Sequence, residues 1–349
     1  MIYIIYFIVA LFISLLIVPK VRIFAIAKGI VDKPSERKIH SGEIARIGGV
    51  AVFTTFWITI FLVYLFNNKL LDFSSESIFS IDRNLWAIFI GSLIVFVLGV
   101  IDDIRGIKST HKLLWHFVAG FVVVLLGIKI WWVHSPFGGL LIIDDWSYLL
   151  VPLWVVLMIN VMNWWDGVDG QASGIGIIAA IVIFIVSISK YVNQPSSAII
   201  MIVLAGSLLG FLRYNFNPAS IFLGDSGSQF IGFMLAIGAI VSGAKIATAS
   251  LVLGFPILDA MWVIFRRIFS KKSMFEADRL HFHHRLLDLG YSQKKTVLIM
   301  YFISTLFGTV ALVTLGRAEL KFLSLIWLFF VMIAVGLMIS YKLKVNGRK

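Results

Sequence analysis

GVIDDIRG (99–106), NVMNWWDGVDG (160–170), IFLGDSGS (221–228) and DRLHFHHRLLDLG (278–290) are the polar segments that decide how this chain folds. Each follows an apolar run that is long enough to cross a lipid bilayer. Ionisable groups are costly inside a membrane, so such clusters usually mark functional sites. The topology that follows from the loop charges places all of these segments on one side. They therefore predict an active site on one membrane face rather than a transport path through the membrane.

The composition is that of a membrane protein. Of the 349 residues, 60% are hydrophobic and only 14% are charged, whereas soluble domains carry about 25% charged residues. The chain has no cysteine, which excludes disulfides and thiolate metal sites. These features predict a polytopic membrane protein.

Apolar runs of about 20 residues are the expected length of membrane-spanning helices. About eleven such runs are present, and useful strand signals are absent. We expect one all-α integral-membrane domain, residues 1–349, with no repeat and no soluble domain. The predicted spans are 2–18, 47–66, 85–101, 113–128, 147–163, 172–189, 197–212, 228–243, 248–265, 296–314 and 322–341.

The basic residues orient these spans. Most of the 30 lysines and arginines fall in every second connecting segment, and basic loops face the cytoplasm. The N-terminus is therefore predicted outside and the C-terminus inside. The net charge of +12 follows from this topology and from anionic lipid, so no nucleic-acid partner is predicted. The expected cytoplasmic loops are 19–46, 102–112, 164–171, 213–227 and 266–295.

The carboxylate pair Asp102 and Asp103 ends the third predicted span. Adjacent carboxylates can bind a divalent cation, act as a base or cap the next helix. Neighbouring residues on a helix point about 100° apart, so the two are expected to do different jobs. Lys112, at the start of the next span, can contact phosphate as a point charge or anchor its helix at the lipid headgroups.

Asn160, Asn163, Asp166 and Asp169 recur every three residues with interleaved glycines. A continuous helix would place them on one face, whereas the glycines favour a tight turn that can approach a ligand. Amide and carboxylate oxygens suit Mg²⁺, which takes its remaining ligands from phosphates and water. A polar turn without function is the alternative.

The GDSG string around Asp225 is a weak signal taken alone. Its backbone can form an anion-binding nest just before a new span, and the helix N-terminus that follows favours phosphate. GDSG strings also surround serine-protease nucleophiles, but Ser226 lies at a membrane surface without the expected partners. Asp225 makes better sense as a second ligand of a metal held by the Asn/Asp segment.

Three histidines lie close together in the last polar segment: His281, His283 and His284. Three neighbouring histidines suggest zinc, but in helical register His281 and His284 share a face while His283 points away, so the three cannot converge. Together with the nearby arginines they better suit an anionic substrate. A basic cytoplasmic loop that contains histidine by chance is the alternative.

Taken in order, these segments resemble the polyprenyl-phosphate N-acetylhexosamine-1-phosphate transferase superfamily. The resemblance covers nearly the whole chain and includes VDKPSERKIHSGEIARIGGVAVF (31–53) and GFLRYNFNPASIFLGDSGS (210–228). It implies transfer of a sugar-1-phosphate from a UDP-sugar to a lipid phosphate at the cytoplasmic membrane face. The implied cofactor is Mg²⁺, with Mn²⁺ as a possible substitute.

The HFHHRL run (281–286) is similar to that of bacterial undecaprenyl-phosphate GlcNAc-1-phosphate transferases. This branch implies UDP-GlcNAc as donor, undecaprenyl phosphate as acceptor and the start of a cell-envelope polysaccharide. The branch that uses UDP-MurNAc-pentapeptide has a triple histidine followed by an aromatic residue and Glu, whereas Phe282 interrupts the histidines here. Another UDP-N-acetylhexosamine or UDP-MurNAc-pentapeptide is the alternative donor, and an ion-coupled transporter is the alternative class. The resemblance also implies the bacterial cytoplasmic membrane and allows a homodimer.

Residue roles also come from the resemblance. It implies that Asn163 and Asp225 hold Mg²⁺, and that Gly167 and Asp169 border the uracil near Phe222.

Further roles follow by motif position. Lys112 would contact the phosphates, while Asp102, Asp103 and Asp166 are the candidate catalytic carboxylates. Binding of the sugar and diphosphate is implied for the basic loop, through Arg279, His281, His283, His284 and Arg285.

Overall fold

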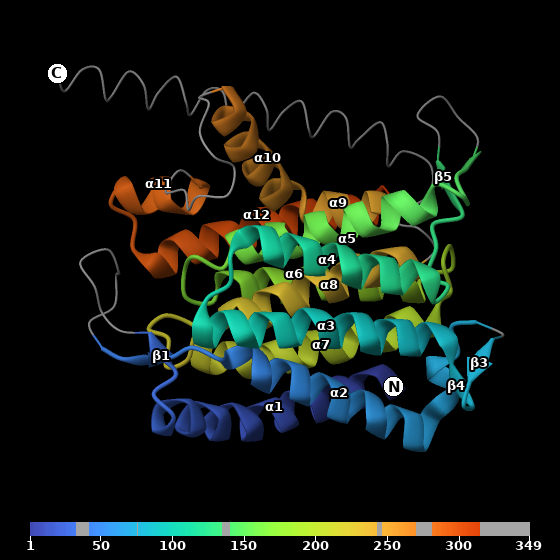
Figure 1. Cartoon of the computed structure of the whole chain (residues 1–349), viewed down its shortest axis with the longest axis horizontal. Helices are drawn as coiled ribbons and strands as arrows, with labels where there is room; N and C mark the ends of the chain where they lie inside the picture. Colours follow the sequence, from blue (N-terminus) through green and yellow to red (C-terminus); the bar gives the residue numbers. More distant parts are fainter. Residues whose placement is uncertain (33–41, 75, 135–139, 243–245, 270–280, 315–349) are drawn as a thin grey trace.

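A computed structural model describes residues 1–32, 42–74, 76–134, 140–242, 246–269 and 281–314. Most of its helices run side by side along one direction, and α10 leaves the bundle at an angle (Figure 1). The helices are α1 (Ile2–Ala27), α2 (Gly48–Asn67), α3 (Arg83–Arg105), α4 (Ser109–Leu125), α5 (Ser147–Trp164), α6 (Gln171–Ile188), α7 (Pro195–Asn215), α8 (Gly224–Val241), α9 (Ile246–Val252), α10 (Gly254–Phe269), α11 (Phe282–Asp288) and α12 (Gln293–Val313), with a short 3-10 turn, η1 (Asn68–Leu71).

The helices confirm the prediction of a mainly helical, polytopic membrane protein. In the described part of the chain, 8 helices are long and apolar enough to cross a membrane. Two shorter apolar helices, Ser109–Leu125 and Gly254–Ile264, also coincide with predicted spans. The last predicted span, 322–341, lies outside the described residues. The number of spans and the side on which each terminus lies stay predictions.

The ninth predicted span, 248–265, is wrong as a single helix. The structure divides it into α9, which ends at Val252, and α10, which begins at Gly254. Pro256 explains the break because it has no N–H to donate to the carbonyl of Val252 four residues earlier. The chain therefore changes direction here, and α10 leaves the bundle at an angle (Figure 1).

The first helix is longer than predicted. α1 continues through Pro19 to Ala27, so the loop expected to begin at residue 19 begins later. Pro19 cannot donate to the carbonyl of Leu15, but the Tyr214 hydroxyl donates to that oxygen at 3.2 Å. A hydrogen bond from α7 thus replaces the missing one within α1.

Helix α8 forms the centre of the bundle. Its residues from Ser226 to Ile240 are buried, and it packs against α2, α3 and α5. The first turn of α8 is closely approached from two sides. A Cβ atom at Gly49 or Gly99 would overlap the backbone of Ser226 or Gly227. Glycine at these positions lets α2 and α3 contact the backbone of α8 directly.

Short strands are present although none was predicted. They form three antiparallel hairpins of two or three residues per strand: β1 (Val31–Asp32) with β2 (Ile44–Ala45), β3 (Ser77–Ile78) with β4 (Ile81–Asp82), and β5 (Trp132–His134) with β6 (Leu140–Ile142). Strands this short carry too few residues for an alternating pattern. The β1 hairpin lies at one end of the bundle, and the other two lie at the opposite end (Figure 1).

Backbone hydrogen bonds join the end of β2 to the segment before α8. Phe222 N–H donates to the Ala45 carbonyl at 2.8 Å, and Gly48 and Gly49 donate to the carbonyls of Phe222 and Leu223 at 2.9 and 2.8 Å. The first N–H groups of α2 are thereby satisfied without a side-chain cap. This pairing fixes one wall of the site described next.

Candidate active site

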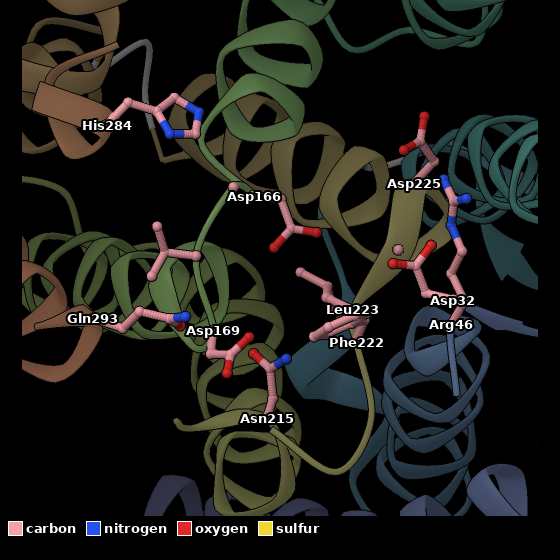
Figure 2. Close-up of a pocket in the computed structure, with 13 residues that line it drawn as sticks. Asp32, Arg46, Asp166, Asp169, Asn215, Phe222, Leu223, Asp225, His284 and Gln293 are labelled. Atoms are coloured by element: carbon pink, nitrogen blue, oxygen red, sulfur yellow. The ribbon is translucent and has the colours of Figure 1, made fainter. Parts of the chain in front are cut away.

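The polar segments meet at the end of the bundle that carries β1. A cavity of about 410 Å³ lies there, within the range of small-molecule sites. In Figure 2, Asp169, Asn215 and Gln293 gather at one end of this cavity, Arg46, Asp32 and Asp225 gather at the other, and Asp166 lies between them. The lining residues are Asp32, Arg46, Asp166, Gly167, Val168, Asp169, Asn215, Phe222, Leu223, Gly224, Asp225, His284 and Gln293.

Asp103 caps the first turn of α8 from the neighbouring helix. Its carboxylate accepts from the backbone N–H of Asp225 at 2.8 Å, from the backbone N–H of Ser226 at 3.1 Å and from the Ser226 hydroxyl at 2.7 Å. Arg46 Nε lies 3.4 Å from it, and the Asp103 side chain is 0% exposed. Gly224 fits beside this carboxylate with a φ of +74°, where a Cβ would lie 2.6 Å from Asp103 Oδ2. Asp103 therefore does not line the cavity.

Lys112 joins two carboxylates from different helices. Its Nζ lies 2.8 Å from Asp102 Oδ2 and 2.9 Å from Asp225 Oδ2. The other oxygen of Asp102 accepts from the backbone N–H of Ile107 at 2.5 Å, where α3 has ended and the chain turns toward α4. The expectation that Asp102 and Asp103 do different jobs agrees with these partners: Asp102 holds Lys112, and Asp103 holds the start of α8.

Asp225 lies in the first turn of α8. The prediction that it precedes the helix is wrong by a few residues, because α8 begins at Gly224 once Asp103 has capped it. Asn163, in the last turn of α5, donates through Nδ2 to Ser228 Oγ at 3.0 Å, which leaves its Oδ1 available as a ligand. An amide oxygen and a carboxylate on neighbouring helices suit a hard cation that takes its other ligands from phosphate and water.

A buried polar chain continues from Asp225 into the bundle. Gln229 Nε2 donates to Asp225 Oδ2 at 3.1 Å, and Gln229 Oε1 lies 3.2 Å from His116 Nε2. The opposite ring nitrogen of His116 lies 3.4 Å from Asn160 Nδ2. Asn160 therefore does not face the cavity, and the first residue of the three-residue repeat supports the site from behind.

The last two residues of that repeat, Asp166 and Asp169, lie in a turn, as the glycines suggested, because α5 ends at Trp164 and α6 begins at Gln171. Gly170 permits the turn with a φ of +81°. The Asp166 carboxylate points into the cavity (Figure 2). Burial raises the pKa of Asp166 well above its ordinary value, and the negative charges of Asp225 and Asp103 raise this pKa further.

Asp169 and Gln293 are linked by Asn217. Asp169 Oδ2 accepts from Asn217 Nδ2 at 2.9 Å and from the backbone N–H of Ala219 at 3.0 Å. The same Asn217 nitrogen donates to Gln293 Oε1 at 2.8 Å. A carboxylate only accepts hydrogen bonds, so the Asn217 NH₂ group must face Asp169. Because the same NH₂ group also donates to Gln293, Gln293 must present its oxygen to Asn217 and direct its own NH₂ group away. This end of the cavity thus offers a carboxylate acceptor beside an amide donor.

The histidine run differs from its predicted register. α11 begins only at Phe282, so His281 is its N-cap and not part of the helix. His283 is 1% exposed, and its ring centroid lies 5.8 Å from that of His281 and 4.3 Å from that of His284. It therefore does not point away from the other two histidines as predicted. A Cβ on Gly167 would lie 2.6 Å from His283 Nε2. Burial lowers the pKa of His283 well below its ordinary value, and the neighbouring His284 and His281 lower it further. His284 lines the cavity.

Several cavity residues were not singled out from the sequence. Asp32 and Arg46 lie inside a segment that carries the family resemblance, and Asn215 lies inside another. Gln293 has no comparable signal, since it begins a helix far along the chain. Arg285 lies in α11, and Arg279 lies outside the described residues.

Comparison with known proteins identifies the class to which this fold and site belong. The family described as "Glycosyl transferase family 4" matches residues 85–243. The chain is 33% identical over 334 residues to the "Probable undecaprenyl-phosphate N-acetylglucosaminyl 1-phosphate transferase" of Bacillus subtilis (strain 168), which covers 94% of this chain and 88% of the relative. The chain belongs to glycosyl transferase family 4 and is a membrane-bound transferase.

Two further relatives carry different names. The "Decaprenyl-phosphate N-acetylglucosaminephosphotransferase" of Mycobacterium tuberculosis (strain ATCC 25618 / H37Rv) is 33% identical over 307 residues, covering 80% of this chain and 74% of the relative. The "Phospho-N-acetylmuramoyl-pentapeptide-transferase" of Caldicellulosiruptor bescii is 33% identical over 235 residues. The match covers 64% of this chain and 70% of the relative. The superfamily predicted from the sequence motifs is confirmed.

Proposed function

We propose that this protein transfers GlcNAc-1-phosphate from UDP-GlcNAc to undecaprenyl phosphate, giving undecaprenyl-diphospho-GlcNAc and UMP. The observation that carries the proposal is the cavity at the polar end of the bundle. It combines Asp225 beside Lys112, an aromatic residue at Phe222, and the acceptor–donor pair of Asp169 and Gln293. The names of the Bacillus subtilis and Mycobacterium tuberculosis relatives favour GlcNAc.

The proposed step exchanges one phosphorus–oxygen bond for another. An oxygen of the lipid phosphate attacks the donor phosphorus that carries the sugar, and the bond from that phosphorus to the UMP oxygen breaks. The bonding electrons leave with UMP, and no net proton is released. A phosphate monoester is largely ionised near neutrality, so a strong base is optional and charge repulsion is the main barrier.

Positive charge at the reacting phosphates is therefore the main requirement. Asn163 and Asp225 would hold Mg²⁺, or Mn²⁺ in its place, and the ion would supply charge neutralisation at the diphosphate. Lys112 adds a positive charge beside Asp225. We assign Asp102 to orienting Lys112 and Asp103 to orienting the first turn of α8.

The carboxylate of Asp166 is proposed as the catalytic carboxylate that faces the reactants. At the base end, Gly167 and Asp169 would border the uracil beside Phe222. At the sugar and diphosphate end we place the basic loop, namely Arg279, His281, His283, His284 and Arg285.

The reaction is tested by measuring UMP release from purified protein with undecaprenyl phosphate, Mg²⁺ and UDP-GlcNAc, UDP-GalNAc or UDP-MurNAc-pentapeptide in parallel. UMP formed only with UDP-GlcNAc, lipid acceptor and metal supports the proposal. UMP release with another donor would support the proposed reaction but contradict GlcNAc as the sugar. Folded protein that releases no UMP with any donor contradicts the reaction and favours a transporter.

We further propose that the cavity faces the cytoplasm in the bacterial cytoplasmic membrane, with the N-terminus outside. The chain has no native cysteine, so single cysteines report topology directly. In intact cells, an impermeant thiol reagent should label the variant Asp145→Cys and spare Lys108→Cys. The reverse pattern would contradict the orientation. Crosslinking in the membrane would show whether the protein forms the expected homodimer.

A further inference from the structure

Asp259 on α10 joins two walls of the site through one buried carboxylate. Its Oδ2 accepts from the Trp165 indole Nε1 at 3.2 Å and lies 2.7 Å from His281 Nδ1. Its Oδ1 accepts from the backbone N–H of Phe282 at 3.0 Å. The side chains of His281 and Asp259 are 9% and 8% exposed. The carboxylate is therefore shared by the end of α5 and the start of α11.

Phe255, one turn before Asp259 on α10, strengthens the same connection. Its ring packs edge to face on Trp165 with centroids 5.4 Å apart and on Phe282 with centroids 4.9 Å apart. Edge-to-face packing of this kind stabilises contacts beyond the burial of area alone. One face of α10 thus contacts the α5–α6 turn and the histidine run at once.

Both joined segments lead directly into the cavity. Trp165 precedes Asp166 and Gly167, which line one wall. The His281 ring is parallel to the His283 ring at 5.8 Å, His283 packs against Gly167, and His284 lines the cavity. The placement of the histidine run against this turn therefore depends on what holds His281.

We propose that Asp259 is a positioning residue that sets the histidine run against the Asp166 wall, and so sets the affinity for the sugar-diphosphate part of the donor. This inference rests on the proposed function. It also assigns a role to Trp165: its indole N–H and the backbone N–H of Phe282 face different oxygens of residue 259, so this residue must offer two acceptors.

The donor arrangement predicts how Asp259→Asn acts. Both carboxylate oxygens face N–H donors, so an amide NH₂ in either orientation faces at least one of them. His281 can adapt by accepting at Nδ1, but the Trp165 N–H cannot. Removing the indole with Trp165→Phe removes that conflict, because the amide can then donate to His281 Nδ1 and accept from Phe282. The two substitutions are therefore expected to be strongly non-additive.

The test is a double-mutant cycle of Asp259→Asn and Trp165→Phe, measured as KM for UDP-GlcNAc, KM for undecaprenyl phosphate, kcat and thermal midpoint. Asp259→Asn should raise KM for the donor about tenfold, with the KM for the lipid unchanged. In the Trp165→Phe background the same substitution should have an effect of about threefold or less. Equal effects in both backgrounds, or a parallel change for both substrates, would overturn the proposal.

A second measurement does not depend on enzyme activity. In ¹⁵N-histidine-labelled wild-type protein, Nδ1 of His281 should carry a proton, assigned by comparison with His281→Gln. Finding the proton only on Nε2 would overturn the proposal even if the enzyme is active. Wild-type protein that shows the Nδ1 proton but releases no UMP would contradict the proposed function and leave the Asp259–His281 contact standing.

Discussion

Replacing Asp103 by alanine should separate the two jobs of the carboxylate pair. The substitution removes the acceptor of two backbone N–H groups and one hydroxyl at the start of α8. The Asp103 side chain is 0% exposed, so water reaches these donors poorly. The first turn of α8, which carries Asp225, should then lose its fixed orientation.

The magnitude follows from the number of donors left unpaired. Each buried donor without a partner costs about 1–3 kcal/mol, and the three share one carboxylate, so their costs are not additive. We expect Asp103→Ala to lower the free energy of unfolding by about 3–5 kcal/mol. The half-exposed Arg46 is left out of this figure because solvent screens its contribution. Ser226→Ala, which removes only the hydroxyl, should cost about 1 kcal/mol.

The assay combines thermal unfolding in detergent with Mn²⁺ binding followed by electron paramagnetic resonance. Asp103→Ala should unfold at a lower temperature than Ser226→Ala, and protein that stays folded should bind Mn²⁺ about tenfold more weakly. Wild-type stability together with wild-type Mn²⁺ affinity in Asp103→Ala would refute the capping role. Wild-type stability together with complete loss of UMP release would instead indicate that Asp103 acts directly on the reacting groups.

Other substitutions test the cavity wall. Gln293→Glu replaces a hydrogen-bond donor by an acceptor beside the proposed uracil site. The affinity for UMP, measured by calorimetry, should fall about tenfold or more, and an unchanged affinity would show that Gln293 does not recognise the base. Because the pKa of Asp166 is raised in the folded protein, wild-type stability should fall as pH rises from about 4 through that raised pKa. Asp166→Asn, measured without substrate or metal, should gain in thermal midpoint relative to wild type over the same range, and parallel curves would contradict the raised pKa. Lys112→Met should reduce kcat/KM at least about a hundredfold and lower Mn²⁺ affinity little; near-normal turnover would exclude Lys112 from the phosphates.

The sequence predicted those parts of the fold that depend on long apolar runs and on charge. Membrane helices have a length set by the bilayer, so most of their positions follow from hydropathy. The exceptions arise from hydrogen bonds made far along the chain. Pro19 does not end α1 because Tyr214 compensates for the lost bond, and α8 begins at Gly224 because Asp103 caps it.

The same distinction applies to the candidate site: residues in polar motifs were predicted, whereas residues placed by contacts far along the chain were not. Residues in dense polar motifs, such as Asp166 and Asp225, were identified because ionisable groups near a membrane are rare. Asp259 lies in no such motif, and its partners Trp165 and His281 are separated from it in sequence. Gln293 could not be found from the sequence, because its orientation is fixed by Asn217 from another loop.

The backbone pairing between residues 45–49 and 221–223 has a consequence for how the protein is made. The N–H groups at the start of α2 find their carbonyl partners only after more than half of the chain has been synthesised. Contacts of such long sequence separation form late because the intervening chain must first be ordered. While the ribosome is still adding helices, this end of α2 must pair with water at the membrane surface. The polar end of the bundle is therefore expected to close after the opposite end, and a nascent chain released before residue 223 would lack the pairing that fixes this wall of the cavity.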